Sequence, residues 1–264
     1  MSESLLDSQY KSAAQRQARL LEHLRLEVFA DAQKLKEALG VSIATVRRDL
    51  SELEGRGLLK RMHGGAAIID QTTRDYVTSV REVTNAQEKA RIGAAAAELI
   101  VEGDAVMIDS GTTSLQVAKH LAGRQSLTFV TNGTDTLSQL VTGGARTIHF
   151  IGGEYIEINR SLGGPMAVDT VRRFSVDKTI LSVTAVDLVR GLIATGSPQI
   201  GAVQQAMIDV ARTVIVVADQ SKFQRTALSV IASLRAVTHI VTNEETRAQT
   251  RGLRSDLRSK FIFA

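Results

Sequence analysis

The stretch GVSIATVRRDLSELEGRGLLKRMHGGA, residues 40–66, decides the fold of the first part of this chain. Ser42 is well placed to cap a helix over 43–54, because a hydroxyl there accepts a hydrogen bond from an otherwise unpaired backbone N–H. Apolar residues recur along this segment at helical spacing, namely Ile43, Val46, Leu50 and Leu53. We therefore expect a helix that buries one face against its neighbours.

The other face of this helix carries hydroxyl and basic groups. Thr45, Arg47 and Arg48 fall near its start, where hydroxyls can bond phosphates and guanidinium groups can bond a phosphate or a guanine edge. Asp49 can hold an arginine in place through an ion pair. A solvated charged face is the commoner outcome for such residues. Here the glycine turn, the cap, the apolar face and the basic face agree, which favours DNA binding.

Two further helices are expected upstream. The first starts near residue 14 and has one apolar face, formed by Leu20, Leu21, Leu24 and Val28. Asp31 caps a second helix over 32–39, and Gly40 ends it, because glycine readily adopts the left-handed conformation past a helix end. Two helices joined by a tight turn, the second with basic groups near its start, form a helix-turn-helix.

The residues after this helix predict a wing. Residues 58–62 can form a strand, with Lys60 and Arg61 at a turn before the glycine pair 64–65. The basic tip of such a wing would touch the DNA backbone or the minor groove. The residues expected to bind DNA are Ser42, Thr45, Val46, Arg47, Arg48, Lys60, Arg61 and His63.

An ordered motif runs through these segments. Arg16, Leu20 and Leu24 are followed by Ser42 and by the run TVRRDL over 45–50. This motif resembles the helix-turn-helix of DeoR-type bacterial transcription regulators, and the run RMHGGA over 61–66 resembles the wing of the same family. The resemblance implies double-stranded operator DNA as a partner.

The composition excludes several other classes. With 44% hydrophobic and 23% charged residues, the 264-residue chain has the balance of a globular protein with one small and one medium domain. No apolar run reaches membrane-spanning length and the N-terminus lacks a signal-peptide hydrophobic region, so we expect a cytoplasmic, nucleoid-associated protein without a membrane partner. Cysteine is absent and the five histidines lack ligand spacing, so we expect no disulfide, metal or cofactor. A net charge of +4 does not by itself indicate nucleic-acid binding.

The chain is expected to divide into an arm, two domains and a linker. Residues 1–13 would form a mobile arm, 14–67 the winged helix-turn-helix domain, 68–87 a linker and 88–264 an α/β domain. In the last of these, strands are expected over 105–109, 127–131, 147–151, 179–183, 214–218 and 239–242. Helices are expected over 89–101, 114–121, 134–141, 165–174, 202–211 and 245–257. This alternation predicts a doubly wound, mainly parallel sheet with ligands at its carboxyl edge.

Four polar turns follow strands and would meet at that edge. The turn 109–113, DSGTT, combines a glycine, hydroxyl donors and a helix N-terminus, which suits a phosphate. It lacks a following Gly-Lys-Ser/Thr, so nucleotide hydrolysis is poorly supported. Glycine after a strand is commonly plain turn chemistry, but its recurrence at 131–133, 152–154 and 219–222 indicates a small anionic ligand. The expected ligand-binding residues are Asp109, Ser110, Gly111, Thr112, Thr113, Thr131, Asn132, Gly152, Gly153, Asp187 and Lys222, the lysine neutralising a phosphate or sitting in a structural ion pair.

These segments, with 161–164 and 177–178, also resemble the effector domain of the DeoR family, whose fold is related to ribose-5-phosphate isomerase and glucosamine-6-phosphate deaminase. The resemblance implies a phosphorylated sugar or related metabolite as effector and a homo-oligomer, either a dimer or a tetramer. Three places depart from the family pattern: Ala185 stands for a glycine, Ile200-Gly201 for an acidic residue, and Gln204 for a frequent lysine. Either these changes alter effector binding or they are neutral drift.

Two functions follow from these patterns. The first is a repressor of a carbohydrate catabolic operon, released from its operator by the effector. The second is a sugar-phosphate isomerase or deaminase with Asp109 or Asp187 as acid/base. The second is poorly supported, because Arg190-Gly191-Leu192 follows Asp187 where a deaminase would carry its histidine. We therefore expect no catalytic residues.

The C-terminal run 246–260 is rich in arginine. At near-helical spacing these side chains could form a second phosphate-contacting face, but a solvated terminal helix is the better interpretation.

Overall fold

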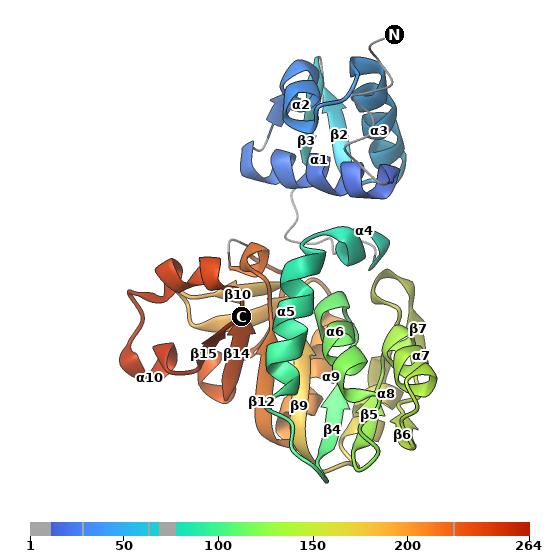
Figure 1. Ribbon diagram of the computed structural model, residues 1–264, viewed down its shortest axis with the longest axis vertical. Helices are drawn as coiled ribbons and strands as arrows, with labels where there is room; N and C mark the ends of the chain where they lie inside the picture. Colours follow the sequence, from blue (N-terminus) through green and yellow to red (C-terminus); the bar gives the residue numbers. More distant parts are fainter. Residues whose placement is uncertain (1–11, 28, 63, 69–77, 224) are drawn as a thin grey trace. The chain divides into compact units, whose positions relative to one another are not determined.

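The computed structural model of the chain describes residues 12–27, 29–62, 64–68, 78–223 and 225–264. The chain splits into two compact units, Met1–Gln71 with Ser79–Thr84 and Thr72–Thr78 with Asn85–Ala264 (Figure 1). Of the arm expected over 1–13, only the last two positions are described, and Ala13 already belongs to the first helix.

The first unit is built on a trihelical fold with a small antiparallel sheet. Its helices are α1 (Ala13–Glu27), α2 (Ala32–Leu39) and α3 (Ile43–Gly55). Its sheet has the order β1-β3-β2, from β1 (Phe29–Asp31), β2 (Leu59–Met62) and β3 (Gly65–Ile68). The helix-turn-helix and the β2–β3 wing were expected, whereas the short strand β1 was not.

The capping residues act as expected from the sequence. Asp31 Oδ1 accepts a hydrogen bond from the Lys34 amide at 2.8 Å, and Ser42 Oγ accepts one from the Thr45 amide at 3.1 Å. Gly40 ends α2 in the left-handed conformation with φ 63°. Asp31 therefore fixes the start of α2, and Gly40 and Ser42 fix the turn between α2 and α3.

A buried ion pair joins α1 to α3. Asp49, whose side chain is 2% exposed, accepts hydrogen bonds from Arg16 Nε at 2.5 Å and Arg16 Nη2 at 3.1 Å. Gln17 Nε2 also donates to Asp49 at 3.3 Å and to Glu52 at 2.9 Å. The ion pair expected of Asp49 thus joins α1 to α3. Its donors also offset the free-energy cost of burying the carboxylate.

The expected linker over 68–87 is partly helical. Residues 69–77 lie outside the described residues, but α4 (Thr78–Val83) and the start of α5 (Ala86–Ala97) fall within the range. The helix expected over 89–101 thus begins and ends earlier than predicted. Asn85 adopts a left-handed conformation with φ 52° just before α5.

The second unit is organised around a seven-stranded sheet of order β15-β14-β12-β9-β4-β5-β6, in which every neighbouring pair is parallel. Its strands are β4 (Ala105–Ile108), β5 (Thr128–Thr131), β6 (Thr147–Phe150), β9 (Val176–Ser182), β12 (Ala211–Val217), β14 (His239–Thr242) and β15 (Phe261–Phe263). This confirms the predicted α/β class. Successive strands run outward from β4 to β6 and then from β9 to β15, so the order reverses between β4 and β9.

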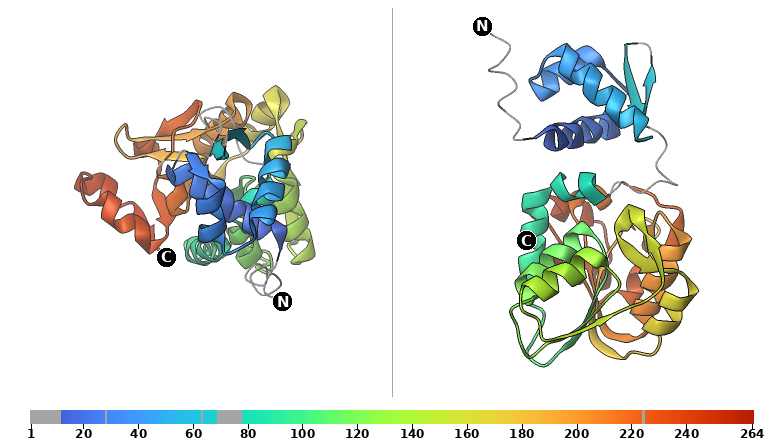
Figure 2. Two further views of the ribbon diagram at one scale, coloured as in Figure 1. Left: turned by 90° about the horizontal axis from the view of Figure 1, so that it is seen from above. Right: turned by 90° about the vertical axis from the view of Figure 1, so that its right-hand side faces the viewer.

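Helices cover both faces of this sheet, with alternate strand residues feeding two cores (Figure 2). On one face, Val106 and Ile108 pack with residues of α5, α6 (Thr112–Leu121) and α7 (Thr134–Thr142). On the other, Met107 packs with residues of α8 (Gly164–Val171) and α9 (Pro198–Asp209). This is the doubly wound arrangement, which places the switch point at the carboxyl ends of β4 and β9.

Two antiparallel additions were not predicted. The hairpin of β7 (Glu154–Ile156) and β8 (Ser161–Gly163) encloses a 3₁₀ turn, η3 (Glu157–Asn159). A separate sheet has the order β10-β11-β13, from β10 (Ala185–Asp187), β11 (Leu192–Thr195) and β13 (Ser229–Ser233). These strands are short, so they offer too few residues for a recognisable alternation.

The terminal helix expected over 245–257 was wrong. The segment forms a 3₁₀ helix, η6 (Glu244–Thr250), then a short α10 (Ser255–Arg258), and ends in strand β15 beside β14. Gly252 separates the two helical pieces, and the side chains of Thr246 and Thr250 hydrogen-bond to Thr242 and to the Arg247 carbonyl. These local bonds compete with a continuous α-helix.

Gly111 lies where the sheet and α6 approach most closely. Its φ is +128°, and a Cβ atom there would lie 2.7 Å from Cβ of Ser182. We expect Gly111→Ala to destabilise the second unit by about 2 kcal/mol or more, because both strain and overlap oppose it. The melting temperature should fall by roughly 4–8 °C.

Gly123→Ala is the matched control for thermal denaturation of the full chain. Gly123 has no neighbour within 4 Å of its would-be Cβ and no positive φ, so its melting temperature should stay near that of the parent. Equal melting temperatures for the two variants would contradict the steric argument.

Candidate nucleic-acid interface and ligand pocket

The exposed face of α3 carries two unpaired cations. Arg47 and Arg48 are both exposed and, within the part of the chain that the structure describes, neither makes a hydrogen bond or ion pair. The hydroxyls of Ser42 and Thr45 bond each other at 2.8 Å, besides the cap. Val46, expected among the DNA-binding residues, is fully buried in the core. It therefore supports the exposed residues on either side rather than presenting a side chain.

The wing is tied back to α3. Lys60 and Arg61, expected at the turn, lie within β2, because the register pairs Lys60 with Ala67, Arg61 with Ala66 and Met62 with Gly65. Arg61 Nη1 donates to Ser51 Oγ at 2.7 Å, and the Arg61 amide donates to Glu54 Oε1 at 2.9 Å. His63 lies outside the described residues. Arg61 thus fixes the wing strand against the end of α3.

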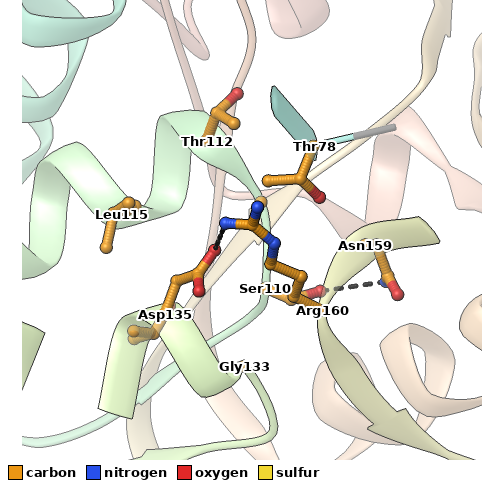
Figure 3. A pocket seen from close by; sticks show the side chains of 10 residues that line it. Thr78, Ser110, Thr112, Leu115, Gly133, Asp135, Asn159 and Arg160 are labelled. Carbon is orange, nitrogen blue, oxygen red and sulfur yellow. Dashed lines mark hydrogen bonds and ion pairs between the residues drawn. The ribbon is translucent and has the colours of Figure 1, made fainter. Parts of the chain in front are cut away.

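A pocket lies at the carboxyl edge of the second unit, where the turns after β4 and β5 meet the β7–β8 hairpin. The empty space within and in front of it, counted together with the part open to solvent, is about 210 Å³. Its lining comes from four separate segments of the chain. The lining residues are Thr78, Ser110, Gly111, Thr112, Leu115, Gly133, Asp135, Thr136, Asn159 and Arg160 (Figure 3). Of the expected ligand-binding residues, Ser110, Gly111 and Thr112 line it.

The N-terminus of α6 opens onto this pocket. The amides of Thr112 and Thr113 have no carbonyl partner one turn earlier, as at every helix start, and they carry the positive end of the helix dipole. The next amide, that of Ser114, donates to Ser182 Oγ at 3.1 Å, which anchors the helix start on β9. The Ser114 and Ser182 hydroxyl oxygens lie 2.7 Å apart. Thr112 lines the pocket, so its amide is the donor of this helix start that an anion there would meet.

The β7–β8 hairpin supplies a cation that the sequence did not single out. Arg160 follows η3 with φ 50°, and its Nη1 lies 3.2 Å from Asp135 Oδ2 across the pocket. Its neighbour Asn159 is buried and donates to Ser110 Oγ at 3.1 Å (Figure 3). A non-glycine residue in the left-handed region points to a functional constraint, but no sequence pattern reveals that conformation here.

Several expected ligand residues form the supporting wall. Thr131 Oγ1 donates to the Ile108 carbonyl at 2.7 Å and accepts from the Gly133 amide at 3.1 Å. Asn132 Nδ2 donates to the Leu162 carbonyl at 3.0 Å, which joins the β5 turn to the hairpin. Gly153 approaches the hairpin so closely that a Cβ would lie 2.4 Å from the Gly163 oxygen. Gly152, Gly153, Thr113, Thr131 and Asn132 are not among the described lining residues.

Asp187 and Lys222 do not line the pocket either. Asp187 ends β10, and its Oδ1 accepts a hydrogen bond from the Arg190 amide at 2.8 Å. Asp187 therefore stabilises a turn of the antiparallel sheet. The charge of Lys222 acts on Asp219, which favours the structural ion-pair alternative for this lysine.

Asp219 is surrounded by donors and cations. Burial alone raises the pKa of Asp219, but the charges of Lys222 and Lys89, with hydrogen bonds from Ser221 and Asn85, outweigh it and lower the pKa to about 2. Asn85 Nδ2 donates to Asp219 Oδ1 at 2.9 Å. The start of α5 is thereby tied to the turn after β12.

Asp109, next to the pocket residue Ser110, has a raised pKa, in contrast to Asp219. Its carboxylate is 1% exposed and accepts a hydrogen bond from Gln204 Nε2 at 2.7 Å. Gln204 Nε2 also donates to the Ser182 carbonyl at 2.7 Å. Burial raises the pKa of Asp109 from 3.8 to about 7, although the bonds from Gln204 and Ser110 act against the rise. The family-pattern departure at Gln204 thus places a neutral amide beside this carboxyl group.

Two other site classes receive no support from the described residues. The described residues contain no cluster of three or more His, Cys, Asp or Glu that could hold a metal ion. No helix in the same part of the chain is long and apolar enough to cross a membrane.

The raised pKa of Asp109 predicts a pH-dependent stability. The folded chain binds the proton more tightly than the unfolded chain, so the free energy of unfolding should fall as the pH rises from about 4 to about 7. In Asp109→Asn this loss, a few kcal/mol at most, should be absent. Melting temperatures measured from pH 5 to pH 8 should therefore diverge between parent and variant. The exposed Asp256→Asn should follow the parent, and parallel curves for Asp109→Asn would contradict the prediction.

Comparison with known proteins covers both units. The model of the DeoR-like helix-turn-helix domain matches residues 16–72, and that of the DeoR C terminal sensor domain matches residues 84–244. The transcriptional repressor AccR of Agrobacterium fabrum is 48% identical over 255 residues, which cover 97% of this chain and 99% of that protein. The glycerol-3-phosphate regulon repressor of Escherichia coli is 31% identical over 229 residues, covering 87% and 90%.

Among solved structures, ribose 5-phosphate isomerase A from Methanocaldococcus jannaschii is similar at a TM-score of 0.41 and 12% identity, covering 53% of this chain and 55% of that one. A likeness this distant supports no functional conclusion. The matches to the two family models and to the repressors establish the family of the chain. It belongs to the DeoR family of transcriptional repressors, with an N-terminal helix-turn-helix domain and a C-terminal sensor domain.

Proposed function

We propose that this repressor controls a carbohydrate catabolic operon and leaves its operator when a phosphorylated sugar or related metabolite occupies the sensor pocket. The repressor would act in the cytoplasm as a homo-oligomer, either a dimer or a tetramer, with one α3 in each half-site. A closed oligomer presents paired recognition helices, which matches the symmetry of a palindromic operator.

The observation that carries the effector proposal is the pocket at the carboxyl ends of β4 and β5. The first turn of α6, the Thr112 side chain and the Arg160 guanidinium lie around one small space. A helix-start amide, that of Thr112, and a guanidinium are donors of the kind that bind phosphate oxygens. Thr112 and Gly111 come from the turn that the sequence identified, whereas Arg160 comes from the hairpin.

The name of one relative supports a small phosphorylated effector. One relative is the repressor of a glycerol-3-phosphate regulon and another is a putative repressor of the aga operon, at 31% identity each. Their coverage of at least 87% of this chain includes the sensor domain. An effector of the same chemical class would fit a pocket with helix-start amides and a single arginine.

Release of the operator requires that the effector bind two states of the protein differently, because affinity alone shifts no equilibrium. Thr78 offers a chemical link for such a shift. Its side chain lines the pocket and donates to the Ile158 carbonyl at 3.1 Å, in the hairpin that carries Arg160. The residues that follow Thr78 in the chain, 79–84, belong to the first unit.

The DNA-binding proposal predicts a loss of affinity in two single variants. Arg47→Ala and Arg48→Ala should each weaken binding to DNA from upstream of the gene by roughly 5- to 150-fold, which corresponds to 1–3 kcal/mol for a lost base or phosphate contact. Fluorescence anisotropy at several salt concentrations measures both affinity and the number of phosphate contacts.

The double variant Arg251→Gln with Arg258→Gln is the control, since both arginines are exposed in the C-terminal run. Its operator affinity should equal that of the parent if this face is only solvated. A comparable loss in the control would show that the C-terminal face contacts DNA. Unchanged affinity in both α3 variants would sink the assignment of α3 as the recognition helix.

The effector proposal predicts that a sugar phosphate both stabilises the protein and dissociates the operator complex. A thermal-shift screen of pentose, hexose and triose phosphates should identify a ligand by the mass-action rise in melting temperature. The same compound should lower operator affinity, whereas its dephosphorylated form should do neither. If no phosphorylated metabolite changes either quantity, the effector proposal fails while the DNA-binding result stands.

A further inference from the structure

We propose that Arg160 is the anion-binding side chain of the sensor pocket and that Asp135 is its counter-ion in the empty state. When a phosphomonoester takes the guanidinium, Asp135 accepts a hydrogen bond from a hydroxyl group of the same ligand. The pocket therefore selects a polyol phosphate over a phosphate ester without hydroxyls. This inference rests on the proposed function and names the groups that recognise the effector.

Arg160 is the one cationic side chain among the described residues that line the pocket. Two of the neighbouring hydroxyls are already engaged: Thr78 Oγ1 donates to the Ile158 carbonyl, and Ser110 Oγ accepts from Asn159. Lys222, the cation that the sequence favoured, lies beside Asp219 instead. A phosphate in this space thus has one full positive charge available to it, that of Arg160.

The backbone of Arg160 is held in place. Its carbonyl accepts hydrogen bonds from the Thr134 amide at 2.9 Å and from Thr134 Oγ1 at 3.0 Å. On either side, Asn159 donates to Ser110, and Ser161 Oγ donates to Asn159 Oδ1 at 2.8 Å. These bonds fix the backbone of Arg160, so a change of partner involves its side chain.

The resting ion pair is one that a ligand can break. Arg160 Nη1 and Asp135 Oδ2 lie 3.2 Å apart, and the side chains are 39% and 33% exposed (Figure 3). Partly exposed pairs contribute little stability, since water and salt screen them. A dianionic phosphate offers the guanidinium a stronger, bidentate partner, with the α6 amides completing the contact.

When a ligand phosphate binds the Arg160 guanidinium, the Asp135 carboxylate loses its ion-pair partner and needs a new hydrogen-bond donor. A carboxylate accepts hydrogen bonds only, so it accepts from a ligand hydroxyl but repels a second anionic group. Sites built to bond a hydroxyl discriminate strongly against analogues that lack it, because their polar group is then left unpaired. Asp135 is thus both the competitor of the phosphate and the selector of the polyol.

Titration calorimetry of the full-length protein with two ligands of matched size tests the inference: glycerol 3-phosphate, with two hydroxyls, and n-propyl phosphate, with none. The parent should bind glycerol 3-phosphate at least tenfold more tightly. Asp135→Ala should bind n-propyl phosphate severalfold more tightly than the parent does and should lose most of the preference. Arg160→Gln should weaken both ligands at least tenfold.

Arg254→Gln and Asp256→Ala are the matched controls, because this pair has the same 3.2 Å separation on an exposed surface away from the pocket. Both should leave binding unchanged. Asp135→Asn and Arg160→Lys, with melting temperatures measured without ligand, separate a binding defect from a folding defect: the conservative variants should fall between the parent and the severe ones.

The outcomes distinguish the two proposals. If the parent binds neither ester nor any sugar phosphate, both the effector proposal and this inference are overturned. If the parent binds but Asp135→Ala leaves both the preference and the n-propyl phosphate affinity unchanged, only the inference fails. A tenfold loss in Arg160→Gln together with the gain in Asp135→Ala is the pattern that a purely structural ion pair would not produce.

Discussion

The contact between β9 and the start of α6 is the constraint on which the sensor pocket depends. Ser182, the last residue of β9, bonds both the amide and the hydroxyl of Ser114. The missing side chain of Gly111 lets the backbone come that close. Without this approach the first turn of α6 would not sit over the gap where strand order reverses, and Thr112 would not line the pocket. The position of this helix start at the pocket thus follows from a packing requirement between two segments far apart in the sequence.

Two buried carboxylates show how charge is distributed around that edge. Asp219 has Lys222 and Lys89 nearby, which hold its pKa at about 2 and keep it ionised. Asp109 has only the neutral amide of Gln204 and nearby hydroxyl and amide donors, so burial dominates and its pKa rises to about 7. The lysines of this domain edge are committed to a structural carboxylate. The pocket draws its cation from the hairpin instead, and Asp109 contributes little negative charge to repel an anionic ligand when it is protonated.

The parts of the structure that could be predicted are those set by local chemistry. Asp31, Gly40 and Ser42 fix the boundaries of α2 and α3, since caps and left-handed glycines act on their own neighbours. The alternation of strands and helices likewise gives a doubly wound sheet. What could not be predicted depends on contacts across the fold. The turn after β4 supplies Ser110 and Thr112 to the pocket but turns Asp109 inward, and periodicity does not distinguish these directions. Arg160 was missed for the same reason, because only the folded hairpin brings it opposite Asp135.

The proposed release of the operator by an effector needs a link from the pocket to the DNA-binding unit, and the path of the chain supplies one. Thr78 lines the pocket and bonds Ile158 in the hairpin, and the residues after it belong to the first unit. A ligand that draws Arg160 from Asp135 acts on the same hairpin that holds Thr78. The coupling needed for regulation is on the order of 1–3 kcal/mol, and one or two hydrogen bonds gained or lost contribute about that much. Because the residues after Thr78 belong to the first unit, the proposed regulation would need only a change at the bond between Thr78 and the Ile158 carbonyl, without a path of contacts through either core.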